Sequence, residues 1–382
     1  MAFARCRKYS MQLPLTLTIS YTSAMPSHVT HWLFAERVSD GLGVEFCRDP
    51  EVRPLLVLGS QGPDIFYHNQ RRRPSGLSYG SLMHRHGYGT AVSWMWQWAA
   101  ERALDSRSWA AAWTIGFATH AILDRFTHPF VNYFAGWVVA GDRSTDRYRS
   151  MHPFLERLID VAMLDAQRGC HPRDLDFFSL VDCGSEPSGD WVEMMCHAMS
   201  HTYKEAGRDD ELRDRLRSAY LDTRGYYEFT NYVDEEYLRQ GLLREKKGQV
   251  SLRWMSIVHP LWIPADLDVL NASGRRWCHP CDDSEVFESS FDELFGEAAQ
   301  TAVAALAVIL DEWDKPPTEE RRMTIASTVG DWNLSDGRNT ARPCEKRHSQ
   351  PLPLAELQDR IRARIGASGS TPAATTPPAD GD

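Results

Sequence analysis

Residues 119–129 read Thr119-His120-Ala121-Ile122-Leu123-Asp124-Arg125-Phe126-Thr127-His128-Pro129. Two histidines and an aspartate recur here at every fourth position of a largely apolar run. Because each residue of an α-helix turns by about 100°, residues four apart lie close to one stripe. Imidazole nitrogens and carboxylate oxygens suit zinc, and a metal ion compensates the cost of burying a carboxylate. The stretch therefore predicts a helix with metal ligands on one face.

A second pair with the same spacing follows in His152-Pro153-Phe154-Leu155-Glu156. Proline is acceptable in a first helical turn, so the pair is compatible with the start of a helix. Ligands on consecutive helices can point into the space between them, as in bundle metal sites. The two pairs together predict one shared site.

Further candidate ligands lie upstream, and the sequence does not decide between neighbours: His28 competes with His31, and His86 with His84. Asp64 follows a Gly-Pro turn. The nitrogen and carboxylate ligands together exceed the needs of one tetrahedral zinc. Two or three ions with bridging carboxylates are expected, and such clusters serve phosphate-ester hydrolysis.

The composition is that of an ordinary globular protein. Of 382 residues, 42% are hydrophobic and 25% charged, and the formal net charge is −10. The acidic balance argues against a broad or specific nucleic-acid-binding surface. No apolar run is judged long enough for a transmembrane segment. Some of the many aromatic residues are expected at a lipid-facing mouth, which would allow a transient membrane-surface contact.

The eight cysteines are scattered and indicate no disulfide framework. The one close pair, Cys278 and Cys281, is interpreted as a loop with two thiols. Scattered cysteines without a disulfide framework favour a reducing compartment. A cytoplasmic location is therefore favoured over secretion. Residues 1–24 resemble a weak signal peptide, because basic residues precede a short apolar part. The favoured alternative is a dispensable extension before Met25.

The helical periodicity predicts a mainly α, multi-helix bundle in residues 25–313. We find no convincing alternating strand pattern. Residues 314–366 form a polar C-terminal extension with one short helix from Leu354 to Ile365. Residues 367–382 are expected to be a disordered tail, since they are rich in Ser, Thr, Pro, Ala and Gly. The helices are predicted at residues 31–38 with Ser27 as N-cap, 91–104, 109–133, 151–167, 191–206 and 294–310.

Several short motifs occur together and in order: Met25-Pro26-Ser27, Thr30-His31, Leu58 to Ile65, Met83-His84, Gly116 to His120 with Asp124 and His128-Pro129, and His152 with Glu156. In this combination the chain resembles the bacterial zinc-dependent phospholipase C family, which is related to zinc-dependent single-strand nucleases. The resemblance implies an all-α fold of that type and up to three zinc ions.

Carried over position by position, the resemblance implies the metal ligands His31, Asp64, His84, His120, Asp124, His128, His152 and Glu156. It also implies that Asp64 is the catalytic residue that orients or deprotonates the attacking water.

The chain departs from the family at two positions. Secreted members use the mature N-terminal residue as a ligand, whereas 24 residues precede the motif here. The aromatic residue that recognises choline is not matched, because Ile65 follows Asp64. Choline specificity therefore does not carry over.

The sequence supports a zinc-dependent phosphodiester hydrolase, with a phospholipid as the expected substrate. Two alternatives stay open. One is the same chemistry on another phosphodiester, as in a zinc-dependent nuclease. The other is a non-catalytic metal- or lipid-binding protein with an incomplete cluster.

Overall fold

The computed structural model describes residues 27–230, 234–248, 254–339 and 343–368. These residues are 64% helical and their only sheet is one short hairpin, so the predicted all-α class is confirmed. The helices are α1 His28–Leu42, α2 Arg53–Gly59, α3 Leu77–Arg85, α4 Tyr88–Ala100, α5 Trp109–Ala135, α6 Met151–Arg168, α7 Phe177–Val181, α8 Gly189–Thr202, α9 Leu212–Thr230, α10 Glu235–Lys246, α11 Phe291–Trp313, α12 Glu319–Val329 and α13 Leu354–Ser368.

Short 3₁₀ helices connect several of these elements: η1 Glu45–Arg48, η2 Gly62–Phe66, η3 Arg143–Tyr148, η4 Pro172–Asp174, η5 Ala206–Arg208 and η6 Trp254–Ile257. One antiparallel hairpin pairs β1 Trp277–His279 with β2 Asp282–Phe287.

Helix α5 is the centre of the fold. It begins where the Ser108 hydroxyl accepts a hydrogen bond from the Ala111 N–H, and it runs for 27 residues through Pro129. Small residues on its first turns allow close packing: a Cβ added at Gly116 would lie 2.2 Å from the Leu56 carbonyl oxygen of α2. Helices α1, α2, α4, α6 and α11 all pack against α5. The helix therefore holds its ligand stripe in the interior.

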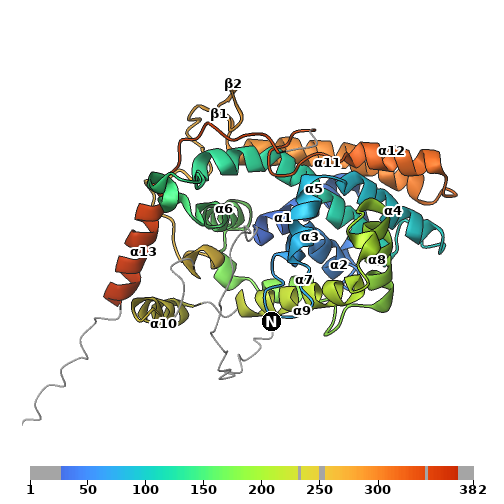
Figure 1. Ribbon diagram of the computed structural model, residues 1–382, viewed down its shortest axis with the longest axis horizontal. Coiled ribbons are helices and arrows are strands. Elements are labelled where there is room, and N and C mark those ends of the chain that lie inside the picture. Colours follow the sequence, from blue (N-terminus) through green and yellow to red (C-terminus); the bar gives the residue numbers. More distant parts are fainter. Residues whose placement is uncertain (1–26, 231–233, 249–253, 340–342, 369–382) are drawn as a thin grey trace, which may run out of the picture.

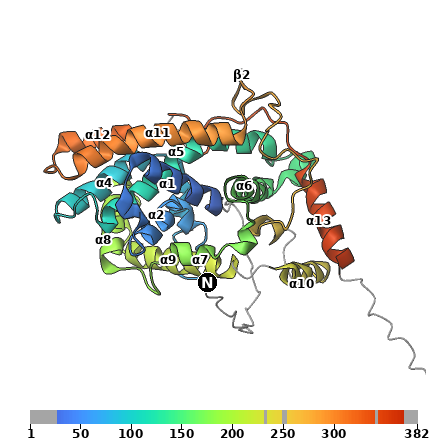
Figure 2. The same cartoon turned by 180° about the vertical axis from the view of Figure 1, so that it is seen from behind.

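The remaining helices are arranged around this centre. Figure 1 shows α11 and α12 along one edge of the molecule and α9 along the opposite edge, with α1, α2 and α3 between them. Helices α10 and α13 lie together at one end, and the view from behind shows the same arrangement (Figure 2). The predicted ligands lie on α1, η2, α3, α5 and α6.

The predicted helices occur close to their expected limits, with one difference in capping. Ser27 stands at the N-cap position of α1, but its side chain makes no cap bond. Its hydroxyl instead donates to Asp160 Oδ1 on α6, at 2.6 Å. A residue type that favours helix starts is used here for a tertiary contact.

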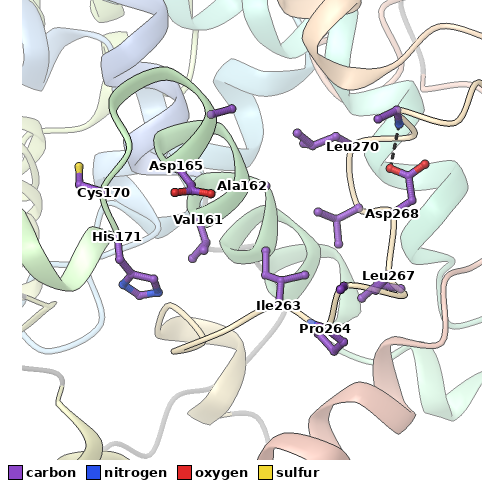
Figure 3. A pocket seen from close by; sticks show the side chains of 14 residues that line it. Val161, Ala162, Asp165, Cys170, His171, Ile263, Pro264, Leu267, Asp268 and Leu270 are labelled. Atoms are coloured by element: carbon purple, nitrogen blue, oxygen red, sulfur yellow. Dashed lines mark hydrogen bonds between the residues drawn. The ribbon is translucent and has the colours of Figure 1, made fainter.

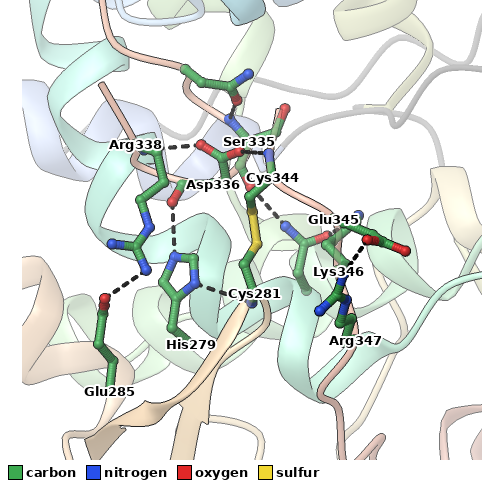
Figure 4. Close-up of a disulfide and its surroundings, with 12 residues drawn as sticks. His279, Cys281, Glu285, Ser335, Asp336, Arg338, Cys344, Glu345, Lys346 and Arg347 are labelled. Atoms are coloured by element: carbon green, nitrogen blue, oxygen red, sulfur yellow. Dashed lines mark hydrogen bonds and ion pairs between the residues drawn. A yellow bond between two sulfur atoms is a disulfide. The ribbon is translucent and has the colours of Figure 1, made fainter. Parts of the chain in front are cut away.

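The cysteine interpretation was wrong for Cys281. The turn of the hairpin separates Cys278 in β1 from Cys281, and Cys281 forms a disulfide with Cys344 (Figure 4). Nearby, the Arg347 and His348 N–H groups both donate to the Pro280 carbonyl. The disulfide thus ties the C-terminal extension to the hairpin. The expectation of no strands failed at the same place, because a three-residue strand shows no alternation.

The C-terminal extension packs onto the helical body. Helix α12, which the sequence did not predict, lies against α4, and the predicted helix near Leu354 is α13, which contacts α6 and α10. The domain boundary after Trp313 stays a prediction. The expectations for residues 1–24 fall outside the described residues, as does nearly all of the expected tail 367–382.

Among the described residues, one helix meets the length and composition expected of a membrane span, contrary to the sequence expectation. It is α11, with a mean hydropathy of 1.5 over its most apolar window. Its apolar face packs on α5, α1 and α12, which is the environment of a core helix.

Candidate metal centre

The structure brings all eight predicted ligands into one connected cluster. They come from five segments: α1 supplies His31, η2 supplies Asp64, the end of α3 supplies His84, and α5 and α6 supply the rest. Their donor atoms form three groups, each with a nitrogen or oxygen atom of every member within 4.8 Å of the others. The groups are His31–His120–Asp124, Asp64–His84–His120 and His128–His152–Glu156.

The carboxylate of Asp124 lies at the centre of the cluster. Its Oδ1 is 3.3 Å from His31 Nε2, and its Oδ2 is 3.1 Å from His120 Nε2. The same Oδ2 lies 3.6 Å from His84 Nε2 and 3.7 Å from His128 Nδ1. Four imidazoles from three helices therefore converge on one carboxylate, as expected for a bridging ligand.

A second carboxylate, Glu156, organises the end of the cluster on α6. Its Oε1 lies 3.3 Å from His152 Nε2 and 3.6 Å from His128 Nε2. His128 is thus shared between the two carboxylates. At the other end, Asp64 Oδ1 lies 3.3 Å from His84 Nε2, and Asp64 Oδ2 lies 3.8 Å from His120 Nδ1.

Three of the histidines are oriented by backbone carbonyls. The Nδ1–H groups point at Gly80 (2.7 Å from His84), Ser60 (3.2 Å from His120) and Leu334 (2.8 Å from His128). We assign the tautomer from these contacts. Each Nε2 is then left as a bare lone pair facing a carboxylate. Histidines that bind a metal through one ring nitrogen usually donate the N–H of the other ring nitrogen to a carbonyl or a carboxylate.

The atoms that face one another fit a metal ion better than a hydrogen-bond network. His120 Nε2, Asp124 Oδ2 and Glu156 Oε2 are buried and have no hydrogen-bond partner. Two ligands held about 2.1 Å from a tetrahedral zinc lie roughly 3.4 Å apart. The nitrogen–oxygen separations of 3.1–3.8 Å cluster around that value. Zinc would satisfy donor atoms that otherwise stay unpaired at a considerable cost.

The carboxylates of Asp124 and Glu156 are anionic. Burial acts to raise the pKa of Asp124, but the neighbouring imidazoles of His120, His128 and His31 hold that pKa well below its usual range. Burial likewise opposes the ionisation of Glu156, yet His152 and His128 lower its pKa to about 2. Both groups are therefore available as negatively charged ligands across the neutral pH range.

Gly62 permits the close approach of η2 to α5. Its φ is +53°, and an added Cβ would lie 2.4 Å from the His120 ring carbon Cγ. A side chain at this position would be strained in its backbone and would displace the imidazole. The Gly-Pro turn before Asp64 therefore has a packing role in the site.

The structure also shows which histidine of each neighbouring pair lies in the cluster, a choice that the sequence left open. His86 is exposed at the end of α3, while His84 is buried in the cluster. His28 points away from His31, and its Nδ1 contacts Arg157 Nη1 at 2.5 Å.

His28 belongs to a neighbouring buried cluster that sequence reasoning missed, with Asp160 and His259. Asp160 Oδ1 accepts from Ser27 Oγ, Thr30 N and Thr30 Oγ1. Its Oδ2 accepts from Arg157 Nη1 and His259 Nε2. The guanidinium already supplies the positive charge, and both oxygens are used, so this cluster does not fit a metal. Its only sequence signal was the position of Asp160 four residues after Glu156.

A separate cavity of about 440 Å³ lies between the second half of α6 and the segment 263–272 (Figure 3). His171 and Cys170 line it. Both His171 nitrogens are engaged, Nε2 with the Pro260 carbonyl and Nδ1 with the Arg173 N–H. None of the eight predicted ligands lines this cavity, so it is separate from the candidate centre.

Comparison with known proteins agrees with this geometry. The family model of zinc-dependent phospholipase C matches residues 30–206, a range that contains every member of the cluster. No curated protein and no solved structure matches the chain. The match over residues 30–206, the helical fold and the convergent ligands together support the zinc-dependent phospholipase C family for this part of the chain.

Proposed function

We propose that the chain is a zinc-dependent hydrolase that cleaves phospholipids at the phosphodiester bond, as a phospholipase C does. The observation that carries the proposal is the convergence of His31, His84, His120 and His128 on the buried carboxylate of Asp124. A shared carboxylate of this kind keeps two or more cations close together, which suits an ester that carries a negative charge. The proposed ligands are the eight cluster residues, with two or three zinc ions.

Each part of the proposed centre would have its own role in the reaction. When bound, zinc supplies positive charge that makes water more acidic and stabilises the leaving oxygen. Asp64 orients the attacking water and accepts its proton. The Gly80, Ser60 and Leu334 carbonyls keep the imidazoles from rotating, so the ligand geometry is maintained during turnover.

The reaction is a hydrolysis at phosphorus. The water oxygen forms a bond to phosphorus, and the bond from phosphorus to the diacylglycerol oxygen breaks. The departing alkoxide takes up a proton, and the water loses one, so the products are diacylglycerol and a phosphorylated headgroup. No oxidant or co-substrate is required. The headgroup preference is not part of the proposal.

A substrate panel tests the reaction class. Purified full-length chain with zinc is incubated with monomeric short-chain phospholipids of different headgroups, phosphatidylcholine included, with single-stranded DNA and with a simple aryl phosphodiester. Release of any phosphorylated headgroup supports the proposal. Cleavage of DNA alone would overturn it in favour of a nuclease, although the net charge of −10 disfavours polyanions. Cleavage of nothing would favour a non-catalytic metal-binding protein.

Metal analysis tests the site. Asp124→Asn should reduce zinc content below that of the wild type and lower hydrolysis by at least about a hundredfold, because second-sphere changes alone cost 10–100-fold. Asp210→Asn, a change at an exposed aspartate, serves as the matched control and should alter neither. A wild type with fewer than two tightly bound metals, or an unaffected Asp124→Asn variant, would contradict the assignment.

A further inference from the structure

The loop between α5 and α6, residues 136–150, joins the two helices that carry the ligands of the Glu156 group. It begins directly after α5, which carries His128, and ends two residues before His152. Among the eight cluster residues the side chains of His152 and His128 are the most exposed, at 22% and 12%, whereas those of the other six are exposed by 7% or less. The solvent-facing end of the cluster is therefore next to this loop.

The loop presents an apolar tip to solvent. Val138 and Val139 are exposed by 37% and 45%. Among the exposed large hydrophobic side chains of the described residues they are the only two that are consecutive. Exposed apolar groups that lie together mark contact surfaces, whereas single ones are ordinary.

Hydrogen bonds hold the tip in shape. The Val139 N–H donates to Thr145 Oγ1 at 2.9 Å, and the Val139 carbonyl accepts from the Asp142 N–H. Asp142 in turn accepts from the Ser144 N–H and hydroxyl. The valines are thus displayed by an ordered turn, and little further ordering would be required on contact.

Basic and aromatic residues flank the tip. The loop carries three arginines against two aspartates, a formal charge of +1, in a chain whose net charge is −10. Arg143 and Arg147 are exposed. The Lys346 ammonium group lies 5.3 Å from the centre of the Trp137 ring, and Arg147 Nη2 donates to the Tyr148 hydroxyl. Apolar groups between cationic and aromatic ones are the chemistry of a membrane interface.

We infer that the α5–α6 loop is a membrane-docking surface, which inserts Val138 and Val139 into the boundary of a phospholipid bilayer and places its arginines among the headgroup phosphates. The inference rests on the proposed function, since a lipid substrate must pass from the bilayer to the exposed side of His152. A bilayer is favoured over a protein partner because the apolar tip is small and the three arginines of the loop are exposed, whereas a stable protein interface needs a larger surface.

Sedimentation with vesicles tests the surface. Full-length wild type should pellet with phosphatidylcholine vesicles, more so when phosphatidylserine is added. The double variant Val138→Asp/Val139→Asp should bind at least about tenfold more weakly, because burial of even one valine side chain is worth more than that factor. Val308→Asp, at a valine 41% exposed on α11, is the matched control and should bind as the wild type does.

Hydrolysis separates this inference from the proposed function. The double variant should lose activity on vesicles about as strongly as binding, yet hydrolyse monomeric short-chain phosphatidylcholine at the wild-type rate. A double variant that still pelleted normally would overturn the docking surface. A wild type that pelleted through these valines but hydrolysed no phospholipid would support the surface and contradict the proposed function. Circular dichroism shows whether the double aspartate variant is folded. If it is not, the milder Val138→Ser/Val139→Ser variant replaces it in both measurements.

Discussion

Asp160 on α6 caps helix α1 from outside it: its Oδ1 accepts a hydrogen bond from the Thr30 backbone N–H at 2.8 Å. The first N–H groups of a helix have no partner within the helix, and Thr30 directly precedes His31. The same oxygen accepts from the Thr30 hydroxyl at 2.8 Å. The carboxylate thereby fixes the start of α1, and with it the position of a proposed zinc ligand.

The first prediction concerns this contact. Asp160→Ala should lower the free energy of unfolding by about 3–5 kcal/mol, because it removes the carboxylate that is paired with the buried Arg157 guanidinium. It should also weaken zinc retention, since His31 loses its support. Urea unfolding and zinc titration measure the two effects. Asp165→Ala, at an exposed position of the same helix, should change neither, and equal losses in both variants would refute the capping role.

The second prediction concerns the turn before Asp64. Gly62→Ala should reduce both stability and zinc content, because the new Cβ collides with the His120 ring. Gly43→Ala is the matched control: its φ of +67° is similar, but nothing lies within 4 Å of the added Cβ. Gly43→Ala should lower the free energy of unfolding by about 1 kcal/mol, from backbone strain alone. If the two variants lose stability equally and both keep their zinc, the close approach of Gly62 to His120 has no functional role.

The third prediction concerns the disulfide. Replacing both Cys281 and Cys344 by serine should lower stability by up to about 4 kcal/mol, the loop-closure value for a separation of 63 residues. Thiol titration of the unfolded, unreduced wild type should find two fewer thiols than cysteines. A full count of eight thiols, the number of cysteines in the chain, would contradict the disulfide and agree with the expected cytoplasmic location.

The fourth prediction concerns pH. Burial, assisted by Arg157, lowers the pKa of His68 from 6.5 to about 3. The folded protein therefore binds this proton less readily than the unfolded chain. The stability linked to His68 is intact above pH 6.5 and is lost as the pH falls toward 3, at about 1.4 kcal/mol per pH unit. His68→Gln should show a shallower decline between pH 7 and 5 in urea unfolding.

A control separates this effect from zinc release on acidification. His201→Gln alters an exposed histidine and should keep the wild-type slope, with chelator present in all samples. If His68→Gln declines as steeply as the wild type, His68 does not remain neutral in the folded protein.

Local spacing explains which parts of the site were predictable. His120, Asp124 and His128 share a stripe because helical geometry alone puts them there, and the same holds for His152 and Glu156. The choice of His31 over His28 was not predictable from one helix, since it depends on which face Asp160 and Arg157 occupy. Those residues lie about 130 positions away in the chain.

Long-range contacts account for two further features that the sequence did not predict. Cys281 and Cys344 were not paired in advance, because cysteine connectivity cannot be deduced from sequence. Helix α12 was missed within a polar stretch whose pattern is weak, although Thr318 accepts a hydrogen bond from the Arg321 N–H as a regular N-cap. In both cases the tertiary partner, rather than local preference, decides the structure.

The bond between His128 and the Leu334 carbonyl spans 206 residues. Synthesis proceeds from the N-terminus, so every side chain of the cluster emerges long before the group that orients His128. A nascent chain that ends at Trp313 would hold all eight donor residues yet lack this constraint on one imidazole. The C-terminal extension thus contributes directly to the geometry of the candidate centre, although it supplies none of the eight predicted ligands.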